Sequence, residues 1–181
     1  PFDIPDTADV EYVYDGLMHL GATIAIDTIN LIASKLPEDN LDVDFSHVLD
    51  EISVPQEQEN IELKSAPKIF KETCEINWSQ PAKTIYDFIR GLSPYPGAWG
   101  SLVLNDGSNS KSLVMKIYKT SKTNRAATGT VGSLVVEKNH LYVNTTDNLL
   151  ELLDIQLSGK KRMGAPSFLN GFKVISNYHF C

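Results

Sequence analysis

The hydrophobic period of this chain changes after Gly97. Upstream of that glycine, apolar residues recur every three or four positions, whereas downstream they alternate with polar residues in short segments. Alternation with a period of two is typical of strands that bury one face. Such strands are expected at 98–104, 112–119, 132–138, 140–145 and 149–157. Because turn sequences such as Asn105-Asp106-Gly107 separate them, this part of the chain predicts a small antiparallel barrel.

The residues before Gly97 predict helices instead. A long amphipathic helix is expected over 7–34, with an apolar stripe formed by Val13, Leu17, Leu20, Ile24 and Leu31. A second helix is expected after Trp78, with Ser79 as its N-cap and Pro81 in its first turn. The acidic, irregular residues 37–65 predict a linker that holds a short helical turn around Ser46–Glu51.

Charge is divided unevenly along the chain. Residues 1–75 hold four Lys or Arg against 17 Asp or Glu, whereas residues 76–181 hold twelve against six. The net charge of −7 therefore conceals a basic C-terminal part. Such asymmetry is a hint of nucleic-acid binding, although twelve spread cations are also compatible with an ordinary solvated surface.

The strongest local cationic signal is Lys160-Lys161-Arg162, at the end of the last expected strand. Three adjacent cations repel one another, so either an anionic ligand relieves them or the loop is simply solvated. Arg90 ends the second helix, where the helix dipole by itself favours a cation. Lys116 and Lys119 are three residues apart on one strand, a spacing that predicts opposite faces. Trp78 and Trp99 are expected either to stack on bases or to pack the helix onto the barrel.

No residue motif in the sequence predicts a catalytic or metal-binding site within this chain. Its four histidines have no partners at metal-ligand or catalytic-triad spacing: His19, His47, His140 and His179. Cys74 and Cys181 fit no metal or redox spacing, so two free thiols in a reducing cytosol are expected. No phosphate-binding loop, dinucleotide fingerprint or signal peptide is visible, and no apolar run is expected to reach membrane-spanning length.

Two segments resemble a known family closely. Residues 147–171 read DNLLELLDIQLSGKKRMGAPSFLNG, in which a short helix with Phe168 and Leu169 follows the cations. Residues 66–97 read APKIFKETCEINWSQPAKTIYDFIRGLSPYPG. Together they resemble the C-terminal part of methionyl-tRNA formyltransferase, and the resemblance covers nearly the whole chain except a stretch near 38–53. Asn77 replaces a usual Asp, and Phe172-Lys173 replaces a basic pair.

The resemblance implies an α+β fragment made of three parts. Residues 1–36 would form the last helix of the catalytic domain, residues 37–75 an acidic linker, and residues 76–181 an OB-like barrel with a packed helix. The family's tRNA-binding cations would correspond to Lys68, Lys71, Arg90, Lys160, Lys161 and Arg162.

The resemblance also implies a function. The parent enzyme would formylate the α-amino group of methionine on initiator methionyl-tRNA, in the cytoplasm, with 10-formyltetrahydrofolate as co-substrate. The family's catalytic Asn, His and Asp have no counterpart here, so the chain is expected to be inactive alone and to hold no cofactor or metal ion. Its expected partners are the tRNA and the upstream catalytic domain, and not a membrane.

Two alternatives remain open at this point. The first is the C-terminal domain of a sugar-nucleotide or other folate-dependent formyltransferase, which would have little use for three adjacent cations on a basic barrel. The second is a freestanding OB-type nucleic-acid-binding module. The helix at 7–34 argues against that module, because a freestanding barrel has no sheet for this helix to cover.

Overall fold

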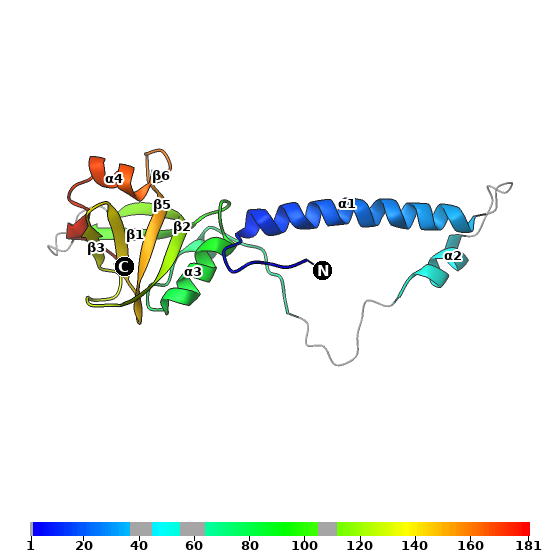
Figure 1. Ribbon diagram of the computed structural model, residues 1–181, viewed down its shortest axis with the longest axis horizontal. Coiled ribbons are helices and arrows are strands. Elements are labelled where there is room, and N and C mark those ends of the chain that lie inside the picture. Colours follow the sequence, from blue (N-terminus) through cyan, green and yellow to red (C-terminus); the bar gives the residue numbers. More distant parts are fainter. Residues whose placement is uncertain (1, 37–44, 55–63, 105–111) are drawn as a thin grey trace. The chain divides into compact units, whose positions relative to one another are not determined.

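The computed structural model describes residues 2–36, 45–54, 64–104 and 112–181 (Figure 1). The chain forms two compact units, one made of residues 1–13 and 69–181, which we call the barrel unit, and one made of residues 14–68. The expected turn at Asn105-Asp106-Gly107 lies outside the described residues.

The unit made of residues 14–68 is helical. It contains most of helix α1 (Val10–Lys35) and all of α2 (Phe45–Ile52), which confirms both expected helices. Lys35 forms an ion pair with Glu51 and so connects the two helices. No residue of α1 is buried, and large apolar side chains such as Leu17 and Ile24 are more than half exposed.

Among the described residues, α1 is the one helix long and apolar enough to cross a membrane, judged by length and composition. The expectation that no segment reaches this length therefore does not hold. The same composition is typical of a helix that packs in the core of a soluble protein.

The barrel unit is an antiparallel sheet in the order β3-β4-β5-β2-β1-β7. Its strands are β1 (Ala98–Leu104), β2 (Leu113–Ala126), β3 (Leu134–Glu137), β4 (His140–Asn144), β5 (Asn148–Leu157), β6 (Met163–Gly164), which pairs with β5, and β7 (Tyr178–Phe180). The short helices are η1 (Glu72–Cys74), α3 (Ala82–Gly91), α4 (Ala165–Gly171) and η2 (Ile175–Asn177). All five expected strands and the OB-like α+β class are confirmed.

The sheet closes where β7 meets the residues before β3. The backbone N–H of Phe180 donates to the carbonyl of Gly132 at 2.9 Å. Gly132 has a φ of +82°, and a Cβ there would lie 2.2 Å from the Phe180 carbonyl oxygen. Only glycine therefore permits this closure.

One hydrophobic core fills the barrel and extends under α3, which Figure 1 shows against the strands. The fully buried side chains include Ile85 and Ile89 from the helix and Leu102, Met115 and Ile155 from the strands. The helix begins two residues later than expected, because Pro81 and not Ser79 occupies the N-cap position. Its first backbone N–H, on Ala82, donates to the carboxylate of Asp147 at 2.8 Å. A residue from the β4–β5 turn thus satisfies an N–H that the helix itself leaves unpaired.

Candidate functional site

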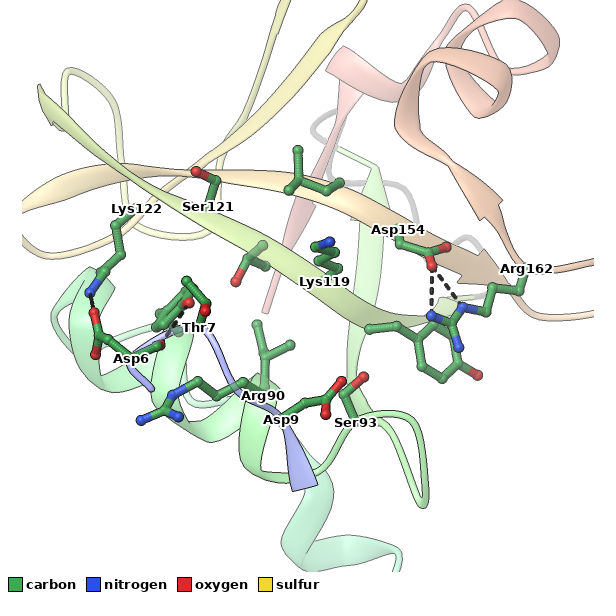
Figure 2. A pocket seen from close by; sticks show the side chains of 15 residues that line it. Asp6, Thr7, Asp9, Arg90, Ser93, Lys119, Ser121, Lys122, Asp154 and Arg162 are labelled. Carbon is green, nitrogen blue, oxygen red and sulfur yellow. Dashed lines mark hydrogen bonds and ion pairs between the residues drawn. The ribbon is translucent and has the colours of Figure 1, made fainter. Parts of the chain in front are cut away.

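A pocket of about 730 Å³ opens in the barrel unit (Figure 2). Four parts of the chain line it: the N-terminal arm (residues 2–9), the end of α3 with Ser93, the middle of β2, and β5 with the following turn. Its charged lining residues are Asp6, Asp9, Arg90, Lys119, Lys122, Asp154 and Arg162. The pocket therefore gathers cations that are far apart in the sequence.

Arg162 is held on one wall by two neighbours. Its Nε and Nη2 atoms lie 2.8 and 2.7 Å from one carboxylate oxygen of Asp154, and its guanidinium lies 4.2 Å from the ring centroid of Tyr118. The hydrogen bond to Asp154 raises the pKa of Arg162. Tyr118 in turn donates its hydroxyl to Gln156 at 2.7 Å, and burial raises the pKa of that hydroxyl. Arg162 was one of three adjacent cations for which the sequence suggested an anionic ligand, but in the fold its charge is already paired with Asp154.

Arg90 connects α3 to the N-terminal arm. Its Nε donates to Asp87 at 2.8 Å, and its Nη1 donates to the carbonyl of Ala8 at 2.8 Å. The hydrogen bond that Arg90 donates to Asp87 raises the pKa of Arg90. This residue therefore holds the arm in place as well as facing the pocket.

Lys122 and Asp6 make a second link between the arm and the barrel. The Lys122 ammonium lies 2.5 Å from the Asp6 carboxylate and 4.8 Å from the ring centroid of Tyr86. The Tyr86 hydroxyl donates to the Asp6 carbonyl at 3.0 Å. The hydrogen bond from Lys122 lowers the pKa of Asp6.

A bulge in β2 places Lys119 on the pocket. The register against β5 shifts between Ile117 and Lys119 and again before Thr120. Met115, Ile117 and Thr120 are buried, so both intervening residues, Tyr118 and Lys119, lie on the outer side of the sheet. A bulge inserts one residue and re-aims the side chain that follows it. The expectation that Lys116 and Lys119 occupy opposite faces is therefore wrong, since both lie on the outer side.

Lys160 and Lys161 lie in the tight turn between β5 and β6. The turn is fixed by backbone hydrogen bonds at both ends, from Lys160 N–H to Leu157 at 2.9 Å and from Ser158 N–H to Val114 at 2.8 Å. Both lysine side chains are exposed. Within the described ranges they have no ion-pair or side-chain hydrogen-bond partner.

The structure brings together some of the predicted cations and not others. Arg90 and Arg162 line the pocket, and Lys160 and Lys161 belong to the turn that carries Arg162. Lys71 is exposed just before η1, and its carbonyl accepts a hydrogen bond from the indole of Trp99 at 2.9 Å. Lys68 is also exposed but belongs to the unit made of residues 14–68.

The two tryptophans pack the protein. Trp78 is 4% exposed and stacks on Phe180 with 4.4 Å between ring centroids. The indole of Trp99 is tied to the Lys71 carbonyl. Of the two expected roles, packing is the one that the structure supports. In the part of the chain that is described, no cluster of His, Cys, Asp or Glu could hold a metal ion, and Cys74 and Cys181 are free thiols.

Comparisons with known proteins agree on one family. The family described as "Formyl transferase, C-terminal domain" matches residues 68–173. A methionyl-tRNA formyltransferase of Parabacteroides distasonis is 43% identical over 179 residues, which are 97% of this chain and 50% of the relative. Those of Bacteroides fragilis and Phocaeicola vulgatus are 43% and 41% identical over 94% and 96% of this chain. The chain spans about half the length of the curated relatives that it matches.

Proposed function

Because this chain belongs to the formyl transferase family, in which it matches a C-terminal portion, we propose that it is the tRNA-binding part of a methionyl-tRNA formyltransferase. The parent protein would transfer a formyl group from 10-formyltetrahydrofolate to the α-amino group of methionine on initiator tRNA, in the cytoplasm. The observation that carries the proposal is the basic composition of residues 76–181, in which several carboxylates already have partners within the protein and several exposed lysines do not.

Several carboxylates of the barrel unit have a partner within the protein. In the barrel unit, Asp87, Glu137 and Asp154 each bind an arginine, Asp6 binds a lysine, and Asp147 caps α3. Lys119, Lys160 and Lys161 are exposed, and among the described residues none of them has an ion-pair partner. Such lysines can neutralise RNA phosphates, whose contacts supply affinity and position without reading bases.

We further propose a division of labour along the chain. Residues 1–36 close the catalytic domain, and residues 37–75 form the linker, whose Lys68 and Lys71 contact tRNA. Residues 76–181 bind tRNA through Arg90, Lys160, Lys161 and Arg162. The formyl-transfer chemistry then belongs to an upstream catalytic domain, which is the second partner, and no membrane takes part. A sugar-nucleotide formyltransferase is not favoured, since the relatives are named for methionyl-tRNA.

The proposal is tested on the longer enzyme. Changing Lys160 and Lys161 to Ala is expected to raise KM for methionyl-tRNA more than it lowers kcat, because the lost contacts bind substrate and transition state alike. This chain alone is expected to show no turnover of 10-formyltetrahydrofolate with charged initiator tRNA. Turnover by the isolated chain, or an unchanged KM in the double variant, would contradict the proposal.

A further inference from the structure

Lys119 differs from the other cations of the pocket in its charge balance. Lys122 is paired with Asp6, Arg90 with Asp87, and Arg162 with Asp154. The remaining carboxylate, Asp9, accepts a hydrogen bond from the backbone N–H of Tyr12 at the start of α1. Lys119 lines the same pocket, is exposed, and has no ion-pair partner within the described ranges. The lining therefore holds four cations and three carboxylates, and Lys119 is the cation among them that has no ion-pair partner within the described residues.

Three residues with side-chain hydroxyl groups line the same pocket as Lys119. Ser93, Thr120 and Ser121 line the pocket, and Ser93 and Thr120 are largely buried. Their hydroxyls make no hydrogen bond within the part of the chain that the structure describes. Figure 2 shows Lys119 on β2 between Ser121 and the Asp154–Arg162 pair. A lysine and hydroxyl groups without hydrogen-bond partners are complementary to a phosphate group, which carries negative charge and several acceptor oxygens.

Ion pairs and a hydrogen bond hold the walls of the pocket in place. The Asp6–Lys122 and Arg90–Ala8 links fix the arm on one side, and Asp154 fixes Arg162 on the other. Lys160 and Lys161 precede Arg162 in the same turn. A polyanion bound along that turn can therefore place a phosphate in the pocket without any rearrangement of the wall.

Resting on the proposed tRNA binding, we propose that this pocket holds one backbone phosphate of the bound tRNA. Lys119 neutralises the phosphate, and the hydroxyls of Ser93 and Ser121 donate hydrogen bonds to its oxygens. Arg162 has a positioning role here, since it holds the turn against Tyr118 while its charge is shared with Asp154. Lys119 is thus a tRNA contact that is separate from the Lys160-Lys161 turn.

Lysine footprinting tests this proposal on the unmodified chain. An amine-acetylating reagent is applied with and without tRNA, and the acetylation rate of each lysine is read by mass spectrometry. We expect tRNA to slow acetylation at Lys119, Lys160 and Lys161 several-fold. Lys138, which is exposed on the β3–β4 turn, serves as the control and is expected to react at an unchanged rate.

The possible outcomes distinguish failure of the pocket assignment from failure of the proposed tRNA binding. Protection of Lys160 and Lys161 without Lys119 would overturn the pocket assignment and leave tRNA binding intact. Protection of no lysine would overturn both. A second arm replaces tRNA with a nucleoside 5′-monophosphate, and protection of Lys119 in this arm alone would assign the pocket to a free nucleotide, against the proposal.

A variant pair gives an independent readout. Lys119→Met is expected to flatten the slope of log K against log salt for tRNA binding by about 0.7–0.9, the contribution of one phosphate contact. Lys138→Asn removes the same charge from a residue with a φ of +56°, a conformation that Asn tolerates. The control is expected to leave the slope unchanged. Equal slopes for the Lys119 variant and the unmodified chain would overturn the proposal.

Discussion

The carboxylate of Asp147 accepts a hydrogen bond from the backbone N–H of Ala82 at 2.8 Å, although 65 positions separate the two residues. This bond joins the β4–β5 turn to the start of α3. The same carboxylate also accepts from the Thr145 hydroxyl at 2.9 Å and from the Asn148 N–H at 2.8 Å. It therefore acts as an N-cap supplied from another part of the fold.

Replacing Asp147 with Ala is expected to lower the free energy of unfolding by about 1 kcal/mol, the usual cost of losing a helix cap. Chemical denaturation of the barrel measures the effect. Ser79→Ala is the matched control, because the sequence predicts Ser79 as the cap and the structure gives its side chain no capping bond. A loss in the Ser79 variant equal to that in the Asp147 variant would contradict the assignment.

The Asp147 cap also predicts a pH dependence. The hydrogen bond from the Ala82 N–H lowers the pKa of Asp147 below its ordinary value of 3.8. Since the folded pKa is the lower one, the stabilisation is complete above pH 3.8 and is lost as the pH falls through the folded pKa. Denaturation curves of the Asp147→Asn variant and the unmodified chain should therefore converge on acidification below about pH 4. A difference that persists unchanged at low pH would argue against an ionised cap.

Replacing Asp154 with Asn is expected to strengthen tRNA binding. The change releases Arg162 from its carboxylate partner, so one more unpaired cation faces the RNA, and the salt slope should steepen by about 0.7–0.9. Loss of a partly exposed ion pair costs stability by less than about 1 kcal/mol, so the barrel should remain folded. Glu137→Gln is the charge-matched control, since Glu137 pairs with Arg125 and does not line the pocket. Weaker binding by the Asp154 variant would contradict this prediction and show that Asp154 matters mainly because it positions Arg162.

The sequence predicted the elements well because they depend on local patterns. The five alternating segments became β1 to β5, and the boundaries of β1 agree with those expected. What it could not predict depends on contacts between distant segments. The cap of α3 comes from Asp147, and the bulge that turns Lys119 outward arises from the pairing of β2 with β5. A strict period of two assigns Lys119 to the wrong face, which is why this residue was not among the predicted cations.

The predicted site illustrates the same limit. The run Lys160-Lys161-Arg162 was visible in the sequence as adjacent charge, but its members differ in the fold. Arg162 is paired with Asp154, whereas the two lysines have no partner among the described residues. Pairing is a property of three-dimensional neighbours, so the sequence could identify the cluster but not which cations remain available.

Helix α1 carries a further prediction about association. Its side chains include Leu17 and Ile24, each more than half exposed, and none of its residues is buried. Because a contiguous exposed apolar surface is unfavourable in water, this chain is expected to self-associate through α1. Analytical ultracentrifugation should show dimers or larger species, and Leu17→Glu with Ile24→Glu should shift them to monomer. A monomeric unmodified chain at high micromolar concentration would count against this expectation.

The most direct measurement of the central claim is the salt dependence of tRNA binding by this chain. We expect weak binding whose slope of log K against log salt flattens by about 1.4–1.8 when Lys160 and Lys161 are both changed to Ala, which corresponds to two lost phosphate contacts at 0.7–0.9 each. Initiator and elongator tRNA should be weakened alike, because phosphate contacts carry no sequence information. An unchanged slope in the double variant would show that the turn is only a solvated loop and would contradict the account.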